Sequence, residues 1–301
     1  MPELPEVETV VRGLRLSLPG RNIVEVRFGK TDFVEDPAAI AERLPGMRIA
    51  DVTRLGKFIC IGLVAGTPGA ALASPRWPLY FIIHLGMTGQ LTVIRSGESV
   101  APHTHGFFVL DNGRELRYTD IRRFGRMLLV PKSGLEDFTG HLGKEPLEIS
   151  AEEFCGYFAS RRARVKALLL DQSVLRGIGN IYADESLFRA RLHPACIAEN
   201  LKKKQLLALH RTVRQVLEEA IRSRGSSISD YVDSDGNRGK FQLRHRVYQR
   251  DGKPCFRCKT IIRRVIVAGR SSHFCPRCQP APRTRKRSEK TLKPQMNTDK
   301  H

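Results

Sequence analysis

The chain has 301 residues, of which 41% are hydrophobic, so it is long enough to bury the cores of two or three domains. No apolar run reaches the ~18 residues of a membrane-spanning helix, and the acidic N-terminus lacks the basic and apolar regions of a signal peptide. These features exclude a membrane-spanning class and predict a cytoplasmic protein.

The net charge of +20 is concentrated at the C-terminal end. Residues 244–280 hold ten Lys and Arg against Asp251 alone, and residues 281–301 hold seven against Glu289 and Asp299. A polyanion is therefore the expected partner, and nucleic acid fits better than phospholipid because no amphipathic anchor accompanies the charge. General solubilising charge is the alternative.

The N-terminal residues Met1 to Glu6 carry the first chemical signal. Removal of Met1 would leave the ring nitrogen of Pro2 as the free terminus, and an α-amino group titrates near pH ~8 where a lysine titrates near ~10.4. Such an amine can attack an electrophile at neutral pH and form a Schiff base, with the carboxyl group of Glu3 beside it. Alternatively, Pro2 only opens a helix whose buried stripe is Val7, Val10, Val11 and Leu14.

Short β-prone segments separated by turn signals follow the first helix. They are 23–28, 47–52, 58–64, 79–84, 90–94, 107–110, 115–119 and 126–130, and Asp111-Asn112-Gly113 marks a hairpin. Because no helices are expected between them, the spacing predicts an antiparallel sandwich or barrel, which we place in an N-terminal domain of residues 2–135. Residues 65–78 are expected to form a surface loop.

Helical periodicity replaces the strand pattern after Pro146, and predicts a second domain over residues 146–225. Ser150 and Glu153 have the spacing of a capping box, and a long amphipathic segment at 201–223 closes at Gly225. Residues 177–180 read Gly-Ile-Gly-Asn at an expected helix start, where backbone amides could receive a phosphate or form a plain turn. They are not a dinucleotide fingerprint, so no nucleotide cofactor is expected.

The glycine- and serine-rich residues 226–243 are expected to form a loop and linker, and a finger should occupy residues 244–279. Four cysteines in the pattern C-x2-C-x16-C-x2-C fit one structural zinc ion, and two strands around a basic turn are expected between the pairs. Residues 280–301 read as a disordered basic tail. The proposed zinc ligands are Cys255, Cys258, Cys275 and Cys278.

Four motifs in this order resemble those of the bacterial formamidopyrimidine-DNA glycosylase (8-oxoguanine DNA glycosylase) family. They are residues 1–10, Arg122 to Gly125, Gly177 to Ala183, and the closing Cys275 to Gln279, and the resemblance spans about residues 2–279. It implies a multidomain α+β fold: an antiparallel β-sandwich with an N-terminal helix, a helix-two-turn-helix domain and a C-terminal β-hairpin zinc finger.

The resemblance also implies catalytic roles. Pro2 matches the nucleophile that attacks C1′ of the damaged nucleotide, and Glu3 matches the acid/base that assists opening of the sugar ring. Lys57 matches a proton donor in β-elimination, although by itself it reads as a solvated strand end. Arg270 matches the finger arginine that grips phosphates at the lesion and is assigned to δ-elimination.

Further residues match DNA contacts of the family. Met87, Arg122 and Phe124 match the residues that fill the hole left by an extruded base, although Met87 and Phe124 alone would read as core residues. His103, Arg161, Lys166 and Asn180 match positions that bind the DNA backbone. Without the resemblance, the basic run 161–166 reads as a solvated helix face. Residues 226–243 are expected to include a lesion-capping loop, a mobile lid over the flipped base, although any flexible connection between the helical domain and the finger would look similar.

The expected function is thus removal of oxidised purines from double-stranded DNA, followed by strand cleavage through β,δ-elimination. The resemblance implies a monomer that binds damaged DNA, with zinc as its only cofactor, in a cytoplasmic, nucleoid-associated location. One alternative is an endonuclease VIII-like enzyme acting on oxidised pyrimidines. The other is a non-catalytic zinc-dependent DNA-binding protein, which would leave Pro2, Glu3 and Lys57 unexplained.

Overall fold

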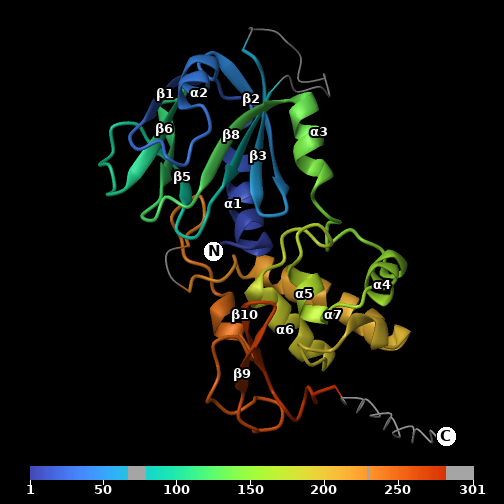
Figure 1. Cartoon of the computed structure of the whole chain (residues 1–301). Coiled ribbons are helices and arrows are strands. Elements are labelled where there is room, and N and C mark those ends of the chain that lie inside the picture. The colour runs from blue at the N-terminus through green and yellow to red at the C-terminus, as the bar shows by residue number, and fades with distance from the viewer. Residues whose placement is uncertain (67–78, 229–230, 283–301) are drawn as a thin grey trace, which may run out of the picture.

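The computed structural model of the chain describes residues 1–66, 79–228 and 231–282, which form two lobes (Figure 1). One lobe is a β-sandwich, and the other combines helices with a C-terminal β-hairpin. The N-terminus lies at the junction of the two lobes (Figure 1). Most of the predicted surface loop at 65–78 and most of the predicted basic tail at 280–301 lie outside the described residues.

The sandwich lobe consists of two four-stranded antiparallel sheets, ordered β1-β6-β7-β5 and β2-β3-β4-β8. Its strands are β1 (Ile23–Phe28), β2 (Met47–Leu55), β3 (Phe58–Ala65), β4 (Leu79–His84), β5 (Gln90–Arg95), β6 (Thr104–Leu110), β7 (Arg114–Thr119) and β8 (Arg126–Pro131). Apolar residues from both sheets share one buried core. The predicted sandwich is therefore confirmed, with β6 and β7 joined at the predicted hairpin.

The expectation that no helix interrupts the strands is wrong. Helix α2 (Pro37–Arg43) lies between β1 and β2, whereas α3 (Lys132–Gly140) comes after β8, the last strand of the sandwich, and interrupts none of them. The side chain of Asp36 caps α2 by accepting a hydrogen bond from Ala39 N, and Pro37 fits its first turn. Only Ile40 of this helix is buried, so the segment is too short to display a helical apolar period.

Helix α1 (Leu4–Ser17) belongs to the cores of both lobes. Val7, Val10, Val11 and Leu14 are fully buried in the sandwich core, which confirms the predicted apolar stripe. Leu4, at the first position of the same helix, is buried in the helical core instead. Because its two ends pack in different lobes, α1 holds the N-terminus between them.

The helical lobe contains α4 (Ala151–Ala159), α5 (Val165–Leu170), α6 (Asn180–Ala190) and α7 (Lys203–Arg222). The predicted capping box begins α4: Ser150 Oγ accepts from Glu153 N, and the Glu153 carboxylate accepts from Ser150 N, both at 3.2 Å. Short 3-10 turns, η1 (Ala198–Asn200) and η2 (Phe241–Arg244), flank α7. No helix in the described ranges is long and apolar enough to cross a membrane.

A buried arginine joins the lobes. Arg54 on β2 forms a bidentate ion pair with Glu145, which follows α3, with nitrogen–oxygen distances of 3.0 and 2.9 Å. Its Nε also donates to Glu8 of α1 at 2.9 Å. Arg54 therefore ties β2 and α1 to the segment that leads into the helical lobe.

The finger hairpin pairs β9 (Arg263–Val267) with β10 (Arg270–Phe274). The two predicted strands are present, but the prediction of a basic turn between them is wrong. Arg263 and Arg264 lie within β9, and the turn is made by Ala268 and Gly269, which both have positive φ angles. Arginine side chains are compatible with an exposed strand, whereas glycine suits the left-handed turn.

Candidate active site

Pro2 and Glu3 lie buried at the junction of the lobes. Pro2 borders a cavity of about 40 Å³ with Met87 from the sandwich lobe, Ile181 from α6, and Tyr231. In the unprocessed chain, Pro2 N is bonded to Met1, which is half exposed. Removal of Met1 would therefore place a secondary amine beside a small, partly closed space.

The carboxylate of Glu3 occupies the N-terminus of α6. It accepts hydrogen bonds from Gly179 N at 2.8 Å and Ile181 N at 3.1 Å. A Cβ atom on Gly179 would lie 2.3 Å from Glu3 Cδ, so glycine is required for this approach. The anion at this helix start is a side chain of the protein and not the phosphate considered from the sequence, although the principle of anion binding there holds.

Burial raises the pKa of Glu3, while Lys57 and the amides of α6 act in the opposite direction. Glu6 is also buried, and burial together with Glu3 raises the pKa of Glu6 to about 7. Glu6 accepts from Glu3 N at 2.9 Å, from Ser226 N at 2.7 Å and from the hydroxyl of Tyr182. The two carboxyl groups therefore connect α1, α6 and the segment after α7.

Lys57 lies in the tight turn between β2 and β3 and is 8% exposed. Burial lowers the pKa of Lys57, Glu3 raises it, and Arg270 lowers it further. The preceding Gly56 has a φ of +60°, and a Cβ atom there would lie 3.1 Å from Arg176 Cβ. The turn thus packs against the loop before α6, which brings the ammonium into the electrostatic reach of both Glu3 and Arg270.

Arg270 begins β10 and is exposed at the edge of a second cavity of about 360 Å³. Asn180, at the start of α6, lines the same cavity together with Arg264 and Tyr248. Two guanidinium groups and an amide around one open space could receive phosphate oxygens. The structure therefore brings together Arg270 and Asn180, which come from different domains.

Met87, Arg122 and Phe124 project from two neighbouring loops of the sandwich. Met87 is 41% exposed and Phe124 is 55% exposed, so neither is a core residue. The Arg122 guanidinium lies 4.6 Å from the centroid of the Phe124 ring. Exposed apolar side chains at loop tips can enter a base stack.

Asp120, which the sequence analysis did not single out, holds these two loops together. Its buried carboxylate accepts from Thr88 Oγ1 at 2.5 Å, from the Tyr118 hydroxyl at 2.9 Å and from Gly125 N at 3.0 Å. It also accepts from Arg122 N at 3.2 Å. Thr88 follows Met87 directly, so one carboxylate positions all three exposed side chains.

The remaining predicted DNA contacts differ in their surroundings. His103 is exposed and has a φ of +64°, and Arg161 is partly exposed before α5. Lys166 requires a correction, because its residue is 0% exposed and its ammonium lies 2.6 Å from Asp184 Oδ1. The charge of Lys166 is satisfied inside the protein, so it cannot reach the DNA backbone from this position.

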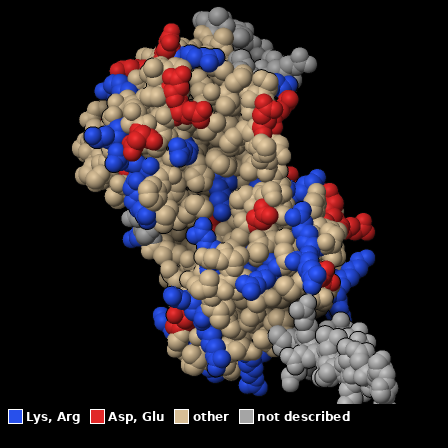
Figure 2. Space-filling model, viewed as in Figure 1, with Lys and Arg blue, Asp and Glu red and all other residues tan. Residues whose placement is uncertain are grey.

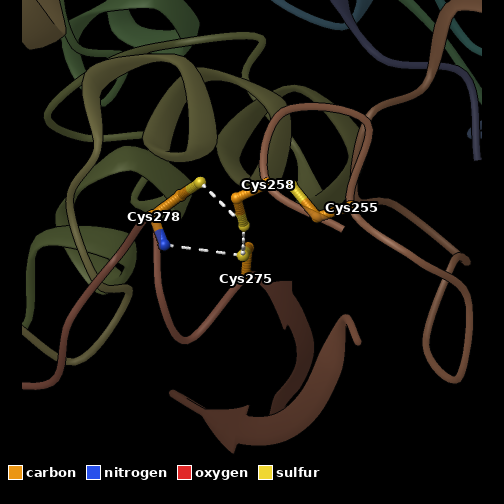
Figure 3. Close-up of side chains that lie close together, drawn as sticks. All are labelled: Cys255, Cys258, Cys275 and Cys278. Atoms are coloured by element: carbon orange, nitrogen blue, oxygen red, sulfur yellow. Dashed lines mark hydrogen bonds between the residues drawn. The ribbon is translucent and has the colours of Figure 1, made fainter. Parts of the chain in front are cut away.

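The four cysteines of the finger come together as predicted (Figure 3). Their sulfur atoms all lie within 4.8 Å of one another, and Cys258 Sγ and Cys275 Sγ are 3.4 Å apart. Tetrahedral zinc has Zn–S distances of ~2.3 Å, so four sulfurs at this spacing fit one ion and leave no open coordination position. The zinc therefore has a structural role, supporting the small core of Phe188, Val247 and Ile262.

Charge is distributed unevenly over the two lobes. Figure 2 shows Lys and Arg side chains gathered over the helical lobe and finger, with acidic and basic groups mixed on the sandwich. A surface of this kind attracts a polyanion.

Comparison with known proteins agrees with this geometry. Residues 1–127 match the formamidopyrimidine-DNA glycosylase N-terminal domain, 142–232 match its H2TH domain, and 252–281 match the zinc finger found in FPG and IleRS. A formamidopyrimidine-DNA glycosylase of Solibacter usitatus is 45% identical over 281 residues, which cover 93% of this chain and 99% of that protein.

Two solved structures are similar along most of the chain. The Lactococcus lactis Fpg in complex with DNA containing an abasic site is 30% identical, with a TM-score of 0.83 over 93% of this chain and 100% of that one. The MutM (Fpg) protein of Thermus thermophilus is 39% identical, with a TM-score of 0.78 over 92% of this chain and 98% of that one. The chain described here belongs to the formamidopyrimidine-DNA glycosylase family.

Proposed function

We propose that this protein is a bifunctional DNA glycosylase and abasic-site lyase that removes oxidised purines, chiefly 8-oxoguanine and formamidopyrimidines, from double-stranded DNA. The observation that carries the proposal is the convergence of Glu3, Lys57 and Arg270 near the N-terminus. Lys57 is close enough to both other residues for Glu3 to raise its pKa and for Arg270 to lower it, and Lys57 in turn lowers the pKa of Glu3. The Lactococcus lactis Fpg solved with abasic-site DNA supports the proposed lyase substrate, and a mutant of the same protein solved with Fapy-dG DNA supports the proposed oxidised-purine substrate.

In the proposed reaction, the free nitrogen of Pro2 attacks C1′ of the damaged nucleotide. The C1′–base bond breaks, the base leaves with a proton, and the sugar ring opens to a cationic iminium. Glu3, held by the amides of α6, exchanges a proton with the sugar-ring oxygen during this opening. The N-terminal helix packs in both lobes, which keeps the amine in place.

The iminium then acts as an electron sink. A C2′ proton is lost to water, the C3′–O bond to the 3′ phosphate breaks in β-elimination, and Lys57 is the proposed donor of a proton to the departing phosphate oxygen. Arg270 is the proposed contact to the phosphates and assists δ-elimination, in which a C4′ proton is lost to water, the C5′–O bond breaks and the 5′ phosphate leaves. Water finally hydrolyses the imine and returns Pro2 to its free form.

The other predicted residues have binding roles in this proposal. Met87, Arg122 and Phe124 would fill the space left by the extruded nucleotide, and Arg122 would hydrogen-bond the unpaired cytosine. His103, Arg161 and Asn180 would contact the DNA backbone. A monomer is expected, and a nucleoid-associated cytoplasmic location follows from the proposed chromosomal substrate.

Borohydride trapping tests the proposal. The protein, with loss of Met1 verified by intact mass, is incubated with duplex carrying 8-oxoguanine opposite cytosine, and the reduced adduct is mapped by peptide mass analysis. We expect one adduct on Pro2. A matched control inserts Ser between Met1 and Pro2, which leaves every side chain but makes the proline nitrogen an amide, and it should give no adduct on that nitrogen.

Two results would favour other functions. Trapping mainly on duplex with an oxidised pyrimidine would support the endonuclease VIII-like alternative. DNA binding without any adduct from the correctly processed protein would support a non-catalytic zinc-dependent DNA-binding protein.

A further inference from the structure

A buried polar network joins the finger to the helical lobe. Asp184 on α6 lies 2.6 Å from the ammonium of Lys166 on α5, and both side chains are 0% exposed. The other carboxylate oxygen of Asp184 accepts from His273 N on β10 at 2.8 Å and lies 3.0 Å from His273 Nδ1. One carboxylate on α6 therefore contacts both α5 and a finger strand.

Lys166 extends this network along β10. Its ammonium donates to the carbonyl oxygen of Ser271 and to Ser272 Oγ, both at 2.8 Å. With the contact to His273, three consecutive residues after Arg270 are tied to α5 and α6. The partner strand β9 is exposed at four of its five residues, so it offers little packing of its own.

Helix α6 contacts both Glu3 and β10, the strand that carries Arg270. Its first amides hold the carboxylate of Glu3, and Asp184 lies about one turn further along the same helix. A rigid helix fixes the separation between groups bound at successive turns. The position of Arg270 relative to Glu3 and the N-terminus thus depends on the bond between Asp184 and β10.

We propose that Asp184, acting with Lys166 and His273, is a positioning residue that places Arg270 against the phosphates of the cleaved nucleotide. This inference rests on the proposed function. It assigns Asp184 no contact with DNA and no part in Pro2 chemistry. Its specific consequence is that loss of Asp184 impairs the step assigned to Arg270 and spares the steps assigned to Pro2.

Asp184→Asn is the direct test, because asparagine has the size of aspartate but cannot neutralise Lys166. The substrate is duplex DNA with a preformed abasic site. Borohydride trapping reports Pro2 chemistry, and denaturing gels separate the β-elimination product from the 3′-phosphate product of δ-elimination. We expect trapping within about twofold of wild type and a δ-elimination rate lower on the order of tenfold.

A double-mutant cycle separates positioning from general stability. If Asp184 acts through Arg270, the variant D184N/R270A should be no slower in δ-elimination than R270A alone. Glu115→Gln is the matched control, because Glu115 is a buried carboxylate paired with Arg117 at 2.8 Å within the sandwich. It should leave the ratio of the two products at the wild-type value.

A second variant covers the case in which Asp184→Asn misfolds, since the ammonium of Lys166 would be left buried without its partner, and an unpaired buried charge is strongly destabilising. Lys166→Met combined with Asp184→Leu removes both charges, and it should remain folded by thermal melting while showing the same selective loss. A wild-type product ratio in the folded variants, or effects of D184N and R270A that multiply, would overturn the role of Asp184. Absence of trapping by wild-type protein would instead contradict the proposed function.

Discussion

The carboxylate of Glu3 lies at the N-terminus of α6, where Gly179 N donates to it at 2.8 Å, although the two residues are 176 positions apart in the sequence. This contact brings a negative charge from the first helix to the positive end of a helix in the other lobe. It also places that charge near Lys57, whose pKa it raises against the effect of burial. The charges of Glu3 and Lys57 should therefore depend on one another.

Glu3→Gln should lower the pKa of Lys57, because Glu3 is the largest influence that favours the charged ammonium. We expect the ammonium to lose its proton at a lower pH in this variant than in wild type. Heteronuclear NMR titration of a lysine-labelled sample measures this without relying on activity. Glu6→Gln is the matched comparison and should cause a smaller shift in the same direction; equal titration of Lys57 in all three proteins would contradict the coupling.

Glu6 should make stability depend on pH near neutrality. The pKa of Glu6 in the folded protein, about 7, lies above the usual value of 4.5. Protonated Glu6 therefore makes its full contribution to the free energy of unfolding below pH 4.5, and this contribution is lost as the pH rises through about 7. Across this window the loss is roughly 3 kcal/mol. Urea unfolding between pH 5 and 8 should show this decline for wild type relative to Glu6→Gln.

The exposed Glu218 on α7 provides the control for that measurement. Glu218→Gln should follow the wild-type dependence on pH. A difference between wild type and Glu6→Gln that stays constant with pH would show that Glu6 is ionised in the folded protein throughout this range.

Asp120→Asn should impair reactions that require a base to be extruded from duplex DNA. An amide cannot accept all four hydrogen bonds that the carboxylate receives, so the loops that carry Met87 and Phe124 should lose their fixed arrangement. We expect excision of 8-oxoguanine from duplex to slow on the order of tenfold or more. Borohydride trapping on single-stranded abasic DNA, which needs no void filling, should be retained.

Asp111→Asn tests whether any aspartate change in the sandwich has this effect. Asp111 lies at the exposed β6–β7 hairpin and accepts from Asn22. It should leave both reactions unchanged. Equal losses on duplex and single-stranded DNA in Asp120→Asn would indicate general damage to the fold instead of misplaced loops.

Removal of zinc should unfold the finger and spare the sandwich. The apolar core around the cysteines is small, whereas the sandwich has its own large core. A chelator, or Cys258→Ser, should weaken binding of abasic duplex at least about tenfold, because Arg270 and the basic hairpin lose their support. Fluorescence anisotropy measures the binding, and limited proteolysis reports which domain remains folded.

Cys196→Ser is the control, since this cysteine lies outside the cluster and is only partly buried. It should bind zinc and DNA as wild type does. Loss of the sandwich together with the finger after zinc removal would contradict the independence of the two cores.

Features that depend on nearby residues could be predicted from the sequence. Alternation and turn residues located the eight strands of the sandwich, and β1 and β4 begin and end at the predicted residues. The spacing of four cysteines predicted their cluster, and the capping box at Ser150 formed as expected. Helix α2 escaped detection because a seven-residue helix with one buried side chain has no clear period.

The sequence by itself thus determined the order of sandwich, helices and finger, the metal ligands and the chemical types available at the site, because these follow from local periodicity and spacing. Only the tertiary structure decided which carboxylates are buried and form hydrogen bonds or ion pairs between different helices, strands and loops. The sequence predicted Lys166 as a surface cation, but in the structure it is paired with Asp184 in the interior. The carboxylate of Glu3 accepts hydrogen bonds from the first amides of α6. Such contacts join residues far apart in the chain, so they depend on how the lobes pack and not on any local pattern.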